Sequence, residues 1–257
     1  AANEATRESS LAVGNQNHAT NKSASAIGVG NTASGEASVA MGNSSTASGD
    51  RSIAIGSGAN ATQGAALAIG RQAEATGSSA VALGYLNKAT NNVAVGVGVN
   101  NKVSGEGATS VGSSNTVTGD NSSVLGRQNT VDGASVAGAV AVGYKNKASG
   151  DRAIAIGEGN DSQKEDTITM GYNNTASVGG AVAIGQDNVA NSGGNAGNTM
   201  IAIGRQNEAT AQDTIAIGRE AKAKNDLSVA IGNRTEATAN AAIAIGTNGA
   251  PSGGNTY

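Results

Sequence analysis

The chain repeats one short phrase along its whole length: a large aliphatic residue, an alanine-like residue, a second large aliphatic residue and then a glycine. Clear copies are Ile53–Gly56, Ile154–Gly157 and Ile243–Gly246. We count seventeen such anchor glycines, and twelve of the sixteen intervals between them are 14 residues long. The anchors are Gly14, Gly28, Gly42, Gly56, Gly70, Gly84, Gly96, Gly112, Gly126, Gly143, Gly157, Gly171, Gly185, Gly204, Gly218, Gly232 and Gly246. A fixed period held across a chain indicates one structural unit stacked on itself.

Each repeat reads as two short strands joined by two corners, with positions counted from the anchor glycine as zero. Residues −3 and −1 are mostly large and aliphatic, and residue −2 is Ala in fourteen copies. This alternation has the period of a β-strand. A second polar–apolar–polar segment, such as Thr32-Ala33-Ser34, has its apolar residue at +5, often with Asn at +3. Gly or Asn, which tolerate positive φ, often follow this segment, as Gly35 does.

The sequence therefore predicts an all-β fold: a parallel β-roll, or solenoid, of about 17 coils with 14-residue repeats. We expect a single domain over residues 1–257, with regular coils over about 10–250. We place the −3 and −1 side chains in the lumen with the Ala at +5, which leaves the −2 Ala row outside. A charged residue at Ala155 would then disturb assembly more than one at Ala148. The opposite assignment, with −3 and −1 facing a partner and Ala filling a very thin lumen, is also open.

Composition excludes several functions and favours self-association. The chain has 39 Gly, one Pro, no Cys, Phe or Trp, and a net charge of −3. It has no basic stripe or aromatic platform for nucleic acid and no run of ~20 apolar residues for membrane insertion. The one histidine, His18, has no evident acidic partner, so we expect no enzyme activity, no cofactor and no metal. A thin roll buries little apolar surface, which favours association along its length.

The period breaks at three places, where extra residues are expected to form surface loops. The intervals around Gly96 are 12 and 16 residues, which places two extra residues around 97–101. The interval from Gly126 to Gly143 is 17 residues, with three extra in 133–139. The interval from Gly185 to Gly204 is 19 residues, with five extra in 191–199. Such insertions fit either a binding role or neutral drift in a tolerant corner.

Arginine and tyrosine gather at position +1, directly after the anchor glycine. Three of the four Tyr residues of the chain stand there. Stacking would place this row on one edge of the roll, and Arg and Tyr are frequent anchors of protein interfaces. An alternative is that they pack across a subunit boundary or satisfy corner carbonyls. The candidate binding residues are Arg71, Tyr85, Arg127, Tyr144, Tyr172, Arg205 and Arg219, together with Asn191, Asn195 and Asn198 of the longest insertion.

The repeated motif resembles the head domain of trimeric autotransporter adhesins of the YadA-like type. Ser38–Gly42, Ser52–Gly56 and Ser228–Gly232 are similar to its Ser-Val-Ala-Ile-Gly repeat, and the likeness covers about residues 10–250. The resemblance implies a left-handed roll, a parallel homotrimer and display on the outer membrane of a Gram-negative bacterium. It also implies virulence-related adhesion to host extracellular-matrix proteins of the collagen, fibronectin or laminin class.

Two departures and two alternatives accompany this resemblance. The family's neck, stalk and membrane anchor are missing, so we expect an excised head, and the family has no compact motif that would identify the ligand. An ice-binding β-solenoid is one alternative, although charged residues such as Glu74 and Lys88 interrupt its Thr rows. A non-binding structural spacer is the other.

Overall fold

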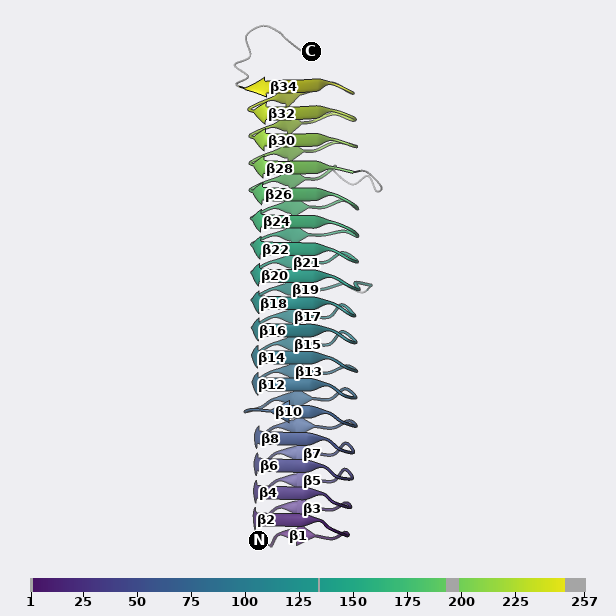
Figure 1. Ribbon diagram of the computed structural model, residues 1–257, viewed down its shortest axis with the longest axis vertical. Coiled ribbons are helices and arrows are strands. Elements are labelled where there is room, and N and C mark those ends of the chain that lie inside the picture. Colours follow the sequence, from purple (N-terminus) through teal and green to yellow (C-terminus); the bar gives the residue numbers. More distant parts are fainter. Residues whose placement is uncertain (1, 134, 193–198, 248–257) are drawn as a thin grey trace. The chain divides into compact units, whose positions relative to one another are not determined.

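The computed structural model describes residues 2–133, 135–192 and 199–247 and forms a parallel β-solenoid of about 17 coils (Figure 1). Each coil contributes one long and one short strand. The long strands of all coils form one sheet and the short strands form the other. Among the described residues no helix occurs, and so none that could cross a membrane. The chain divides into unit 1, Ala1–Gln128, and unit 2, Asn129–Tyr257. The expectation of a single domain over 1–257 stays a prediction.

The long strands carry the aliphatic–Ala–aliphatic–Gly phrase. In unit 1 they are β2 (Leu11–Asn15), β4 (Ser25–Val29), β6 (Val39–Asn43), β8 (Ile53–Ser57), β10 (Leu67–Ile69), β12 (Val81–Tyr85), β14 (Val95–Val99), β16 (Thr109–Ser113) and β18 (Ser123–Arg127). In unit 2 they are β20 (Val140–Tyr144), β22 (Ile154–Glu158), β24 (Ile168–Tyr172), β26 (Val182–Gln186), β28 (Ile201–Arg205), β30 (Ile215–Arg219), β32 (Val229–Asn233) and β34 (Ile243–Thr247).

The short strands carry positions +4 and +5. In unit 1 they are β1 (Glu4–Ala5), β3 (His18–Ala19), β5 (Thr32–Ala33), β7 (Thr46–Ala47), β9 (Asn60–Ala61), β11 (Glu74–Ala75), β13 (Lys88–Ala89), β15 (Lys102–Val103) and β17 (Thr116–Val117). In unit 2 they are β19 (Thr130–Val131), β21 (Lys147–Ala148), β23 (Asp161–Ser162), β25 (Thr175–Ala176), β27 (Val189–Ala190), β29 (Glu208–Ala209), β31 (Lys222–Ala223) and β33 (Glu236–Ala237).

Strands pair in parallel with their equivalents one coil away, and like repeat positions face like. In unit 2, for example, Ala155 of β22 is paired with Ala141 of β20 and with Thr169 of β24. The short strands follow the same rule, so that Ala148 of β21 is paired with Ser162 of β23. This registry lines up each repeat position into a row that runs along the coils of a unit.

The lumen holds the small residues, so the favoured sequence assignment of the two strand faces was wrong. Ala155 at −2 and Ala148 at +5 are both fully buried, whereas Ile154 and Ile156 are only half-buried on the outer face. A coil of 14 residues brings its two sheets too close for facing isoleucines, and only Ala-sized side chains, with occasional Val, fit between them. A charge at Ala155 would therefore damage the fold itself, as would one at Ala148, so the equal burial of the two alanines removes the reason for the predicted contrast between them.

The apparent break around Gly96 was a misassignment of the anchor glycine. The structure pairs Gly98 with Gly84 and with Gly112, so the anchor is Gly98 and this coil has the ordinary length. Gly96 instead takes the −2 position, where a Cβ would lie 3.5 Å from Cγ2 of Val103. A larger +5 side chain is thus matched by a smaller residue across the lumen. The predicted extra residues at 97–101 do not exist.

A ladder of buried asparagines at +3 ties successive coils together. Nδ2 of Asn160 donates to Oδ1 of Asn146 at 3.0 Å, to the Ile156 carbonyl at 3.0 Å and to the Gly171 carbonyl at 2.7 Å. Its own Oδ1 accepts from the backbone N–H and the side-chain amide of Asn174. Such a buried amide is satisfied by its neighbours one coil away, so it stabilises only the stacked form.

Candidate binding and assembly surface

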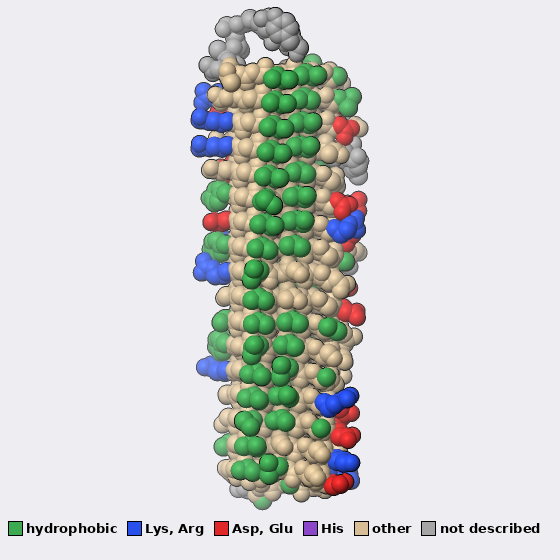
Figure 2. Space-filling view, viewed as in Figure 1, with side chains coloured by type: hydrophobic (Ala, Val, Ile, Leu, Met, Phe, Trp, Pro, Cys, Tyr) green, Lys and Arg blue, Asp and Glu red, His purple; other side chains and the backbone are tan. Residues whose placement is uncertain are grey.

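Two rows of aliphatic side chains cover the outer face of the long-strand sheet in each unit (Figure 2). They are the −3 and −1 residues, which alternate with the buried −2 residues because successive side chains of a strand point to opposite faces. Most of them are half-buried, and several are well exposed: Val13, Leu83, Leu125 and Met170 are 48%, 40%, 53% and 40% exposed. An apolar face that extends over many coils in this way is unusual on a soluble monomer and marks an interaction surface.

Polar residues interrupt the −3 row in unit 1. Thr109 and Ser123 are paired neighbours in β16 and β18, and Ser25 takes the same position in β4. The −1 row continues past them with Val111 and Leu125. The face is therefore apolar along its whole described length in unit 1, but only one row wide at these coils.

The +1 residues lie where the long strands end, on the same outer face, so the predicted Arg/Tyr row exists as one edge of the apolar surface. In unit 1 the Arg71 guanidinium lies 5.1 Å from the ring centroid of Tyr85, a cation–π contact, and Arg127 ends β18. In unit 2 Arg205 and Arg219 are paired neighbours in β28 and β30. Tyr144 and Tyr172 end β20 and β24. In each unit these residues therefore lie in a line along one edge and do not form one pocket.

Only part of the longest insertion can be placed. Asn191 is exposed, and its backbone N–H donates to the Ala209 carbonyl at 2.9 Å. Asn195 and Asn198 lie outside the described residues. Their proposed role in binding stays a prediction.

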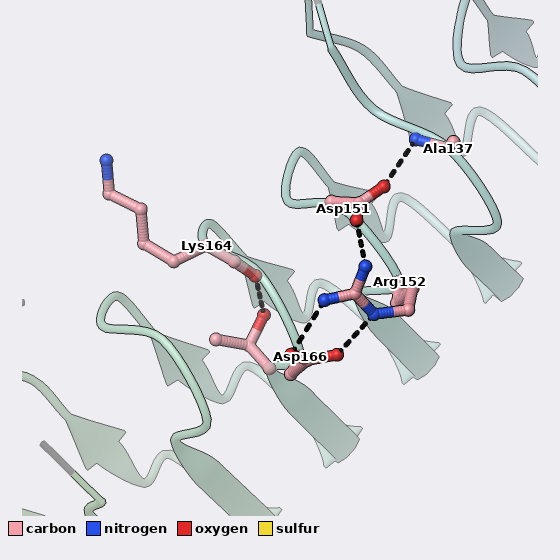
Figure 3. Close-up of polar contacts among 6 residues, drawn as sticks. Ala137, Asp151, Arg152, Lys164 and Asp166 are labelled. Atoms are coloured by element: carbon pink, nitrogen blue, oxygen red, sulfur yellow. Dashed lines mark hydrogen bonds and ion pairs between the residues drawn. The ribbon is translucent and has the colours of Figure 1, made fainter. Parts of the chain in front are cut away.

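A charged cluster that sequence reasoning missed lies at the opposite edge, in the corner that leads into the long strands (Figure 3). Nε and Nη2 of Arg152 donate to the two carboxylate oxygens of Asp166 at 2.7 and 2.9 Å. Arg152 also contacts Asp151, which accepts the Ala137 N–H at 3.0 Å. The hydrogen bonds that Arg152 donates to the Asp166 carboxylate hold the pKa of Asp166 below its ordinary value and raise the pKa of Arg152. These corner acids have no strict period, so the repeat pattern did not reveal them.

The outer face of the short-strand sheet is polar and carries scattered ion pairs between coils. Glu74 and Lys88 approach to 2.7 Å, and Glu208 and Lys222 to 3.3 Å. His18 does have an acidic partner, contrary to expectation, because stacking puts Nδ1 of His18 2.8 Å from Oε2 of Glu4. Both side chains are about half exposed, and among the described residues no group of three or more His, Cys, Asp or Glu could hold a metal ion.

Comparison with known families agrees with the repeat. A family model described as "YadA head domain repeat (2 copies)" matches residues 5–31, 33–59, 61–87, 104–129, 137–160, 163–188, 201–221 and 223–248. No curated protein matches the chain. The family and the solenoid fold are typical of proteins without enzymatic activity. Since the matched segments cover most of the described coils in both units, the chain belongs to the YadA head domain family.

Proposed function

We propose that this chain is the adhesive head of a trimeric autotransporter, a homotrimer of parallel, left-handed rolls displayed on the outer membrane of a Gram-negative bacterium. Its family membership supports this, because YadA-like heads belong to trimeric autotransporters of the Gram-negative cell surface. In this proposal the head is not an enzyme, needs no cofactor and acts by binding host extracellular-matrix proteins of the collagen, fibronectin or laminin class.

The aliphatic face of the long strands is the observation that carries the trimer. Residues such as Ile156 and Ile203 need burial that the thin lumen cannot provide, since the lumen is already filled by Ala202 and its equivalents. A second and third copy placed with their strands parallel would bring like rows together along every coil. Burial of such rows stabilises by about 25 cal/mol per Å² of apolar surface removed from water.

The trimer is tested by measuring the molar mass of the parent in solution by multi-angle light scattering. Ile156→Asn combined with Ile203→Asn should shift the mass toward the monomer while β-structure remains, because both side chains lie on the outer face. Thr175→Asn, on the outer face of the short-strand sheet, is the matched control and should leave the mass unchanged. A parent that is a stable monomer would refute the trimer.

Adhesion is proposed to depend on the features that break the uniform roll, namely the Arg/Tyr row and the insertion within 191–199. Specific interfaces use protruding aromatic and Arg anchors, and a trimer would present each feature three times, so that weak contacts combine by avidity. A solid-phase panel of collagen, fibronectin and laminin tests this. Arg71→Ala with Tyr85→Ala, and a variant with 191–199 shortened to the regular frame, should stay trimeric and bind less. Unchanged adhesion in both variants would mean that the ligand binds the regular surface of the roll, and the proposed site would be wrong.

A further inference from the structure

The two edges of the aliphatic face carry opposite net charge in both units. One edge consists of positions +1 and +2, where the long strands end, and we call it the strand-end edge. The other consists of positions −6 and −5, in the corner before the long strands begin, and we call it the strand-start edge. Figure 2 shows mostly Lys and Arg, with fewer Asp and Glu, along one side of the aliphatic rows, and Asp and Glu, mixed with fewer Lys and Arg, along the other.

In unit 1 the strand-end edge holds Arg71 and Arg127 and, at the described +1 and +2 positions, no acidic residue. The strand-start edge holds more acidic than basic residues. Its acidic members are Glu8, Glu36, Asp50, Glu106 and Asp120, and its basic members are Lys22 and Arg51. The two edges would therefore attract one another if two copies met edge to edge.

In unit 2 the strand-end edge gathers Arg205, Arg219 and Arg234 at successive coils, with Glu220 between the last two. Nε of Arg219 lies 3.2 Å and Nε of Arg234 2.8 Å from the Glu220 carboxylate. No ion pair to Arg205 occurs within the described part of the chain. One carboxylate therefore balances one of these three guanidinium groups. Elsewhere in unit 2 this edge holds Lys145, Glu158 and Asp187, so its described positions carry four cations against three carboxylates, a net charge of +1.

The strand-start edge of the same coils is acidic. Asp213 and Asp226 use Oδ1 to accept the backbone N–H groups of Thr199 and Gln212, at 3.0 and 3.1 Å. A carboxylate has further lone pairs, so each can accept another charge-assisted hydrogen bond. No cation contacts either one in the described part of the chain.

In three coils an arginine on the strand-end edge and an aspartate on the strand-start edge face opposite ways, whereas the coils of Arg71 and Arg205 have no acidic residue at −6 or −5. Arg127, Arg219 and Arg234 stand in the same coils as Asp120, Asp213 and Asp226 respectively. Within one chain such a pair cannot meet, because Asp213 and Arg219 are six residue steps apart on a chain that crosses the sheet at ~3.3 Å per residue, roughly 20 Å. A rotation about an axis parallel to the solenoid, in contrast, brings equal coils of neighbouring copies to the same height.

We propose that copies of this chain recognise one another by these edges. The strand-end edge of one copy packs on the strand-start edge of the next, coil against equal coil. Arg127, Arg219 and Arg234 pair with Asp120, Asp213 and Asp226 of the partner subunit. This inference rests on the proposed trimer and adds to it which edge meets which, and what fixes the register. The aliphatic rows alone do not fix it, because every coil presents nearly the same rows to a slipped partner.

The coil of Glu158 supports the same register. Glu158 is the one acidic residue at a described +1 position, and its coil is the only one of unit 2 with a basic residue, Arg152, at −5. In the equal coil Glu158 meets Arg152 together with Asp151, whereas a slip by one coil toward the C-terminus would place it against Glu165 and Asp166, where like charges repel. That slip would still set Arg205 against Asp213 and Arg219 against Asp226, but it would leave Arg127 and Arg234 with no acidic residue opposite. Arg152 is already paired with Asp166 and Asp151. This coil therefore disfavours a slipped trimer but is not used in the experiments, which change residues of the arginine coils.

Cysteine pairs test which edges meet, because the chain contains no Cys. Arg219→Cys with Asp213→Cys, treated with a short bis-maleimide, should give covalent trimers on denaturing gels. Arg219→Cys alone should give no cross-linked product, whereas like edges in contact would give covalent dimers. The parent's molar mass is measured alongside. A trimeric parent whose double variant does not cross-link would overturn the edge pairing and leave the proposed trimer standing, and a monomeric parent would overturn both.

Charge exchange tests the register. Arg219→Glu should weaken the trimer, and adding Asp213→Lys should restore it, whereas adding Asp226→Lys should not. An exposed pair changes an equilibrium up to about fivefold, so three copies change the trimer dissociation constant up to about 100-fold, and less at 0.5 M salt. Circular dichroism confirms that each variant keeps its β-structure. Restoration by Asp226→Lys in place of Asp213→Lys would overturn the register.

Discussion

The anchor glycine is the position at which the sequence should tolerate change least, and Gly157→Ala is the sharpest test of the stacking. Gly157 has φ +121°, and a Cβ there would lie 2.0 Å from the Gly171 carbonyl oxygen of the next coil. An ordinary C···O contact is about 3.3 Å, so the two strands must part by more than ~1 Å. That movement also strains the 2.7 Å hydrogen bond from Asn160 to the same oxygen. Backbone strain and two to three weakened hydrogen bonds together cost about 3–5 kcal/mol.

Gly180→Ala is the matched control, since Gly180 also has positive φ, +72°, but no atom lies within 4 Å of its added Cβ. It should cost only about 1 kcal/mol, the price of a left-handed alanine. Both variants lose the same unfolded-state entropy, so their difference reports the clash. The free energy of unfolding is measured by denaturant titration at equal protein concentration. If Gly157→Ala destabilises no more than Gly180→Ala, the coils are not held at the separation described here.

Three further predictions follow from the lumen and the corners. Asn160→Ala should lower the free energy of unfolding, measured by denaturant titration, by about 2–4 kcal/mol, because it leaves buried carbonyls and amides without partners. Asn173→Ala, at an exposed corner, should lower it by at most ~1 kcal/mol. Ala155→Glu should abolish the β-sheet circular dichroism of soluble protein, because it buries an unpaired charge in the lumen; retained structure would contradict the assignment of the −2 row. The pKa of Asp166 lies below its ordinary value because Arg152 donates hydrogen bonds to its carboxylate. The contribution of this pair to stability is therefore complete above the ordinary pKa of Asp and is lost as the pH falls through the lowered pKa. In Arg152→Gln, an NMR titration should show the pKa of Asp166 returning toward its ordinary value.

The repeat by itself determined the architecture. A 14-residue period with strand-like alternation and corner glycines leaves stacked parallel coils as the arrangement that satisfies every backbone group, and the structure has them in about 17 coils. It also located the Arg/Tyr row, because a residue at a fixed repeat position, such as Tyr85 or Arg219, must fall on one edge. Local pattern and long-range stacking predict the same architecture because each strand pairs with the equivalent strand of the next coil, which has nearly the same sequence.

Only the tertiary structure decided which strand face is inside. A period of two separates the side chains into two faces but does not say which is buried, and the larger aliphatic residues suggested the wrong one. The distance between the two sheets settled it: Ala148 and Ala155 fill the gap completely, which leaves Ile154 and Ile156 outside. Likewise Val95-Gly96-Val97-Gly98 offers two possible anchors, and only pairing with Gly84 and Gly112 selects Gly98. Lumen width and strand register arise between residues far apart in sequence, so no local pattern records them.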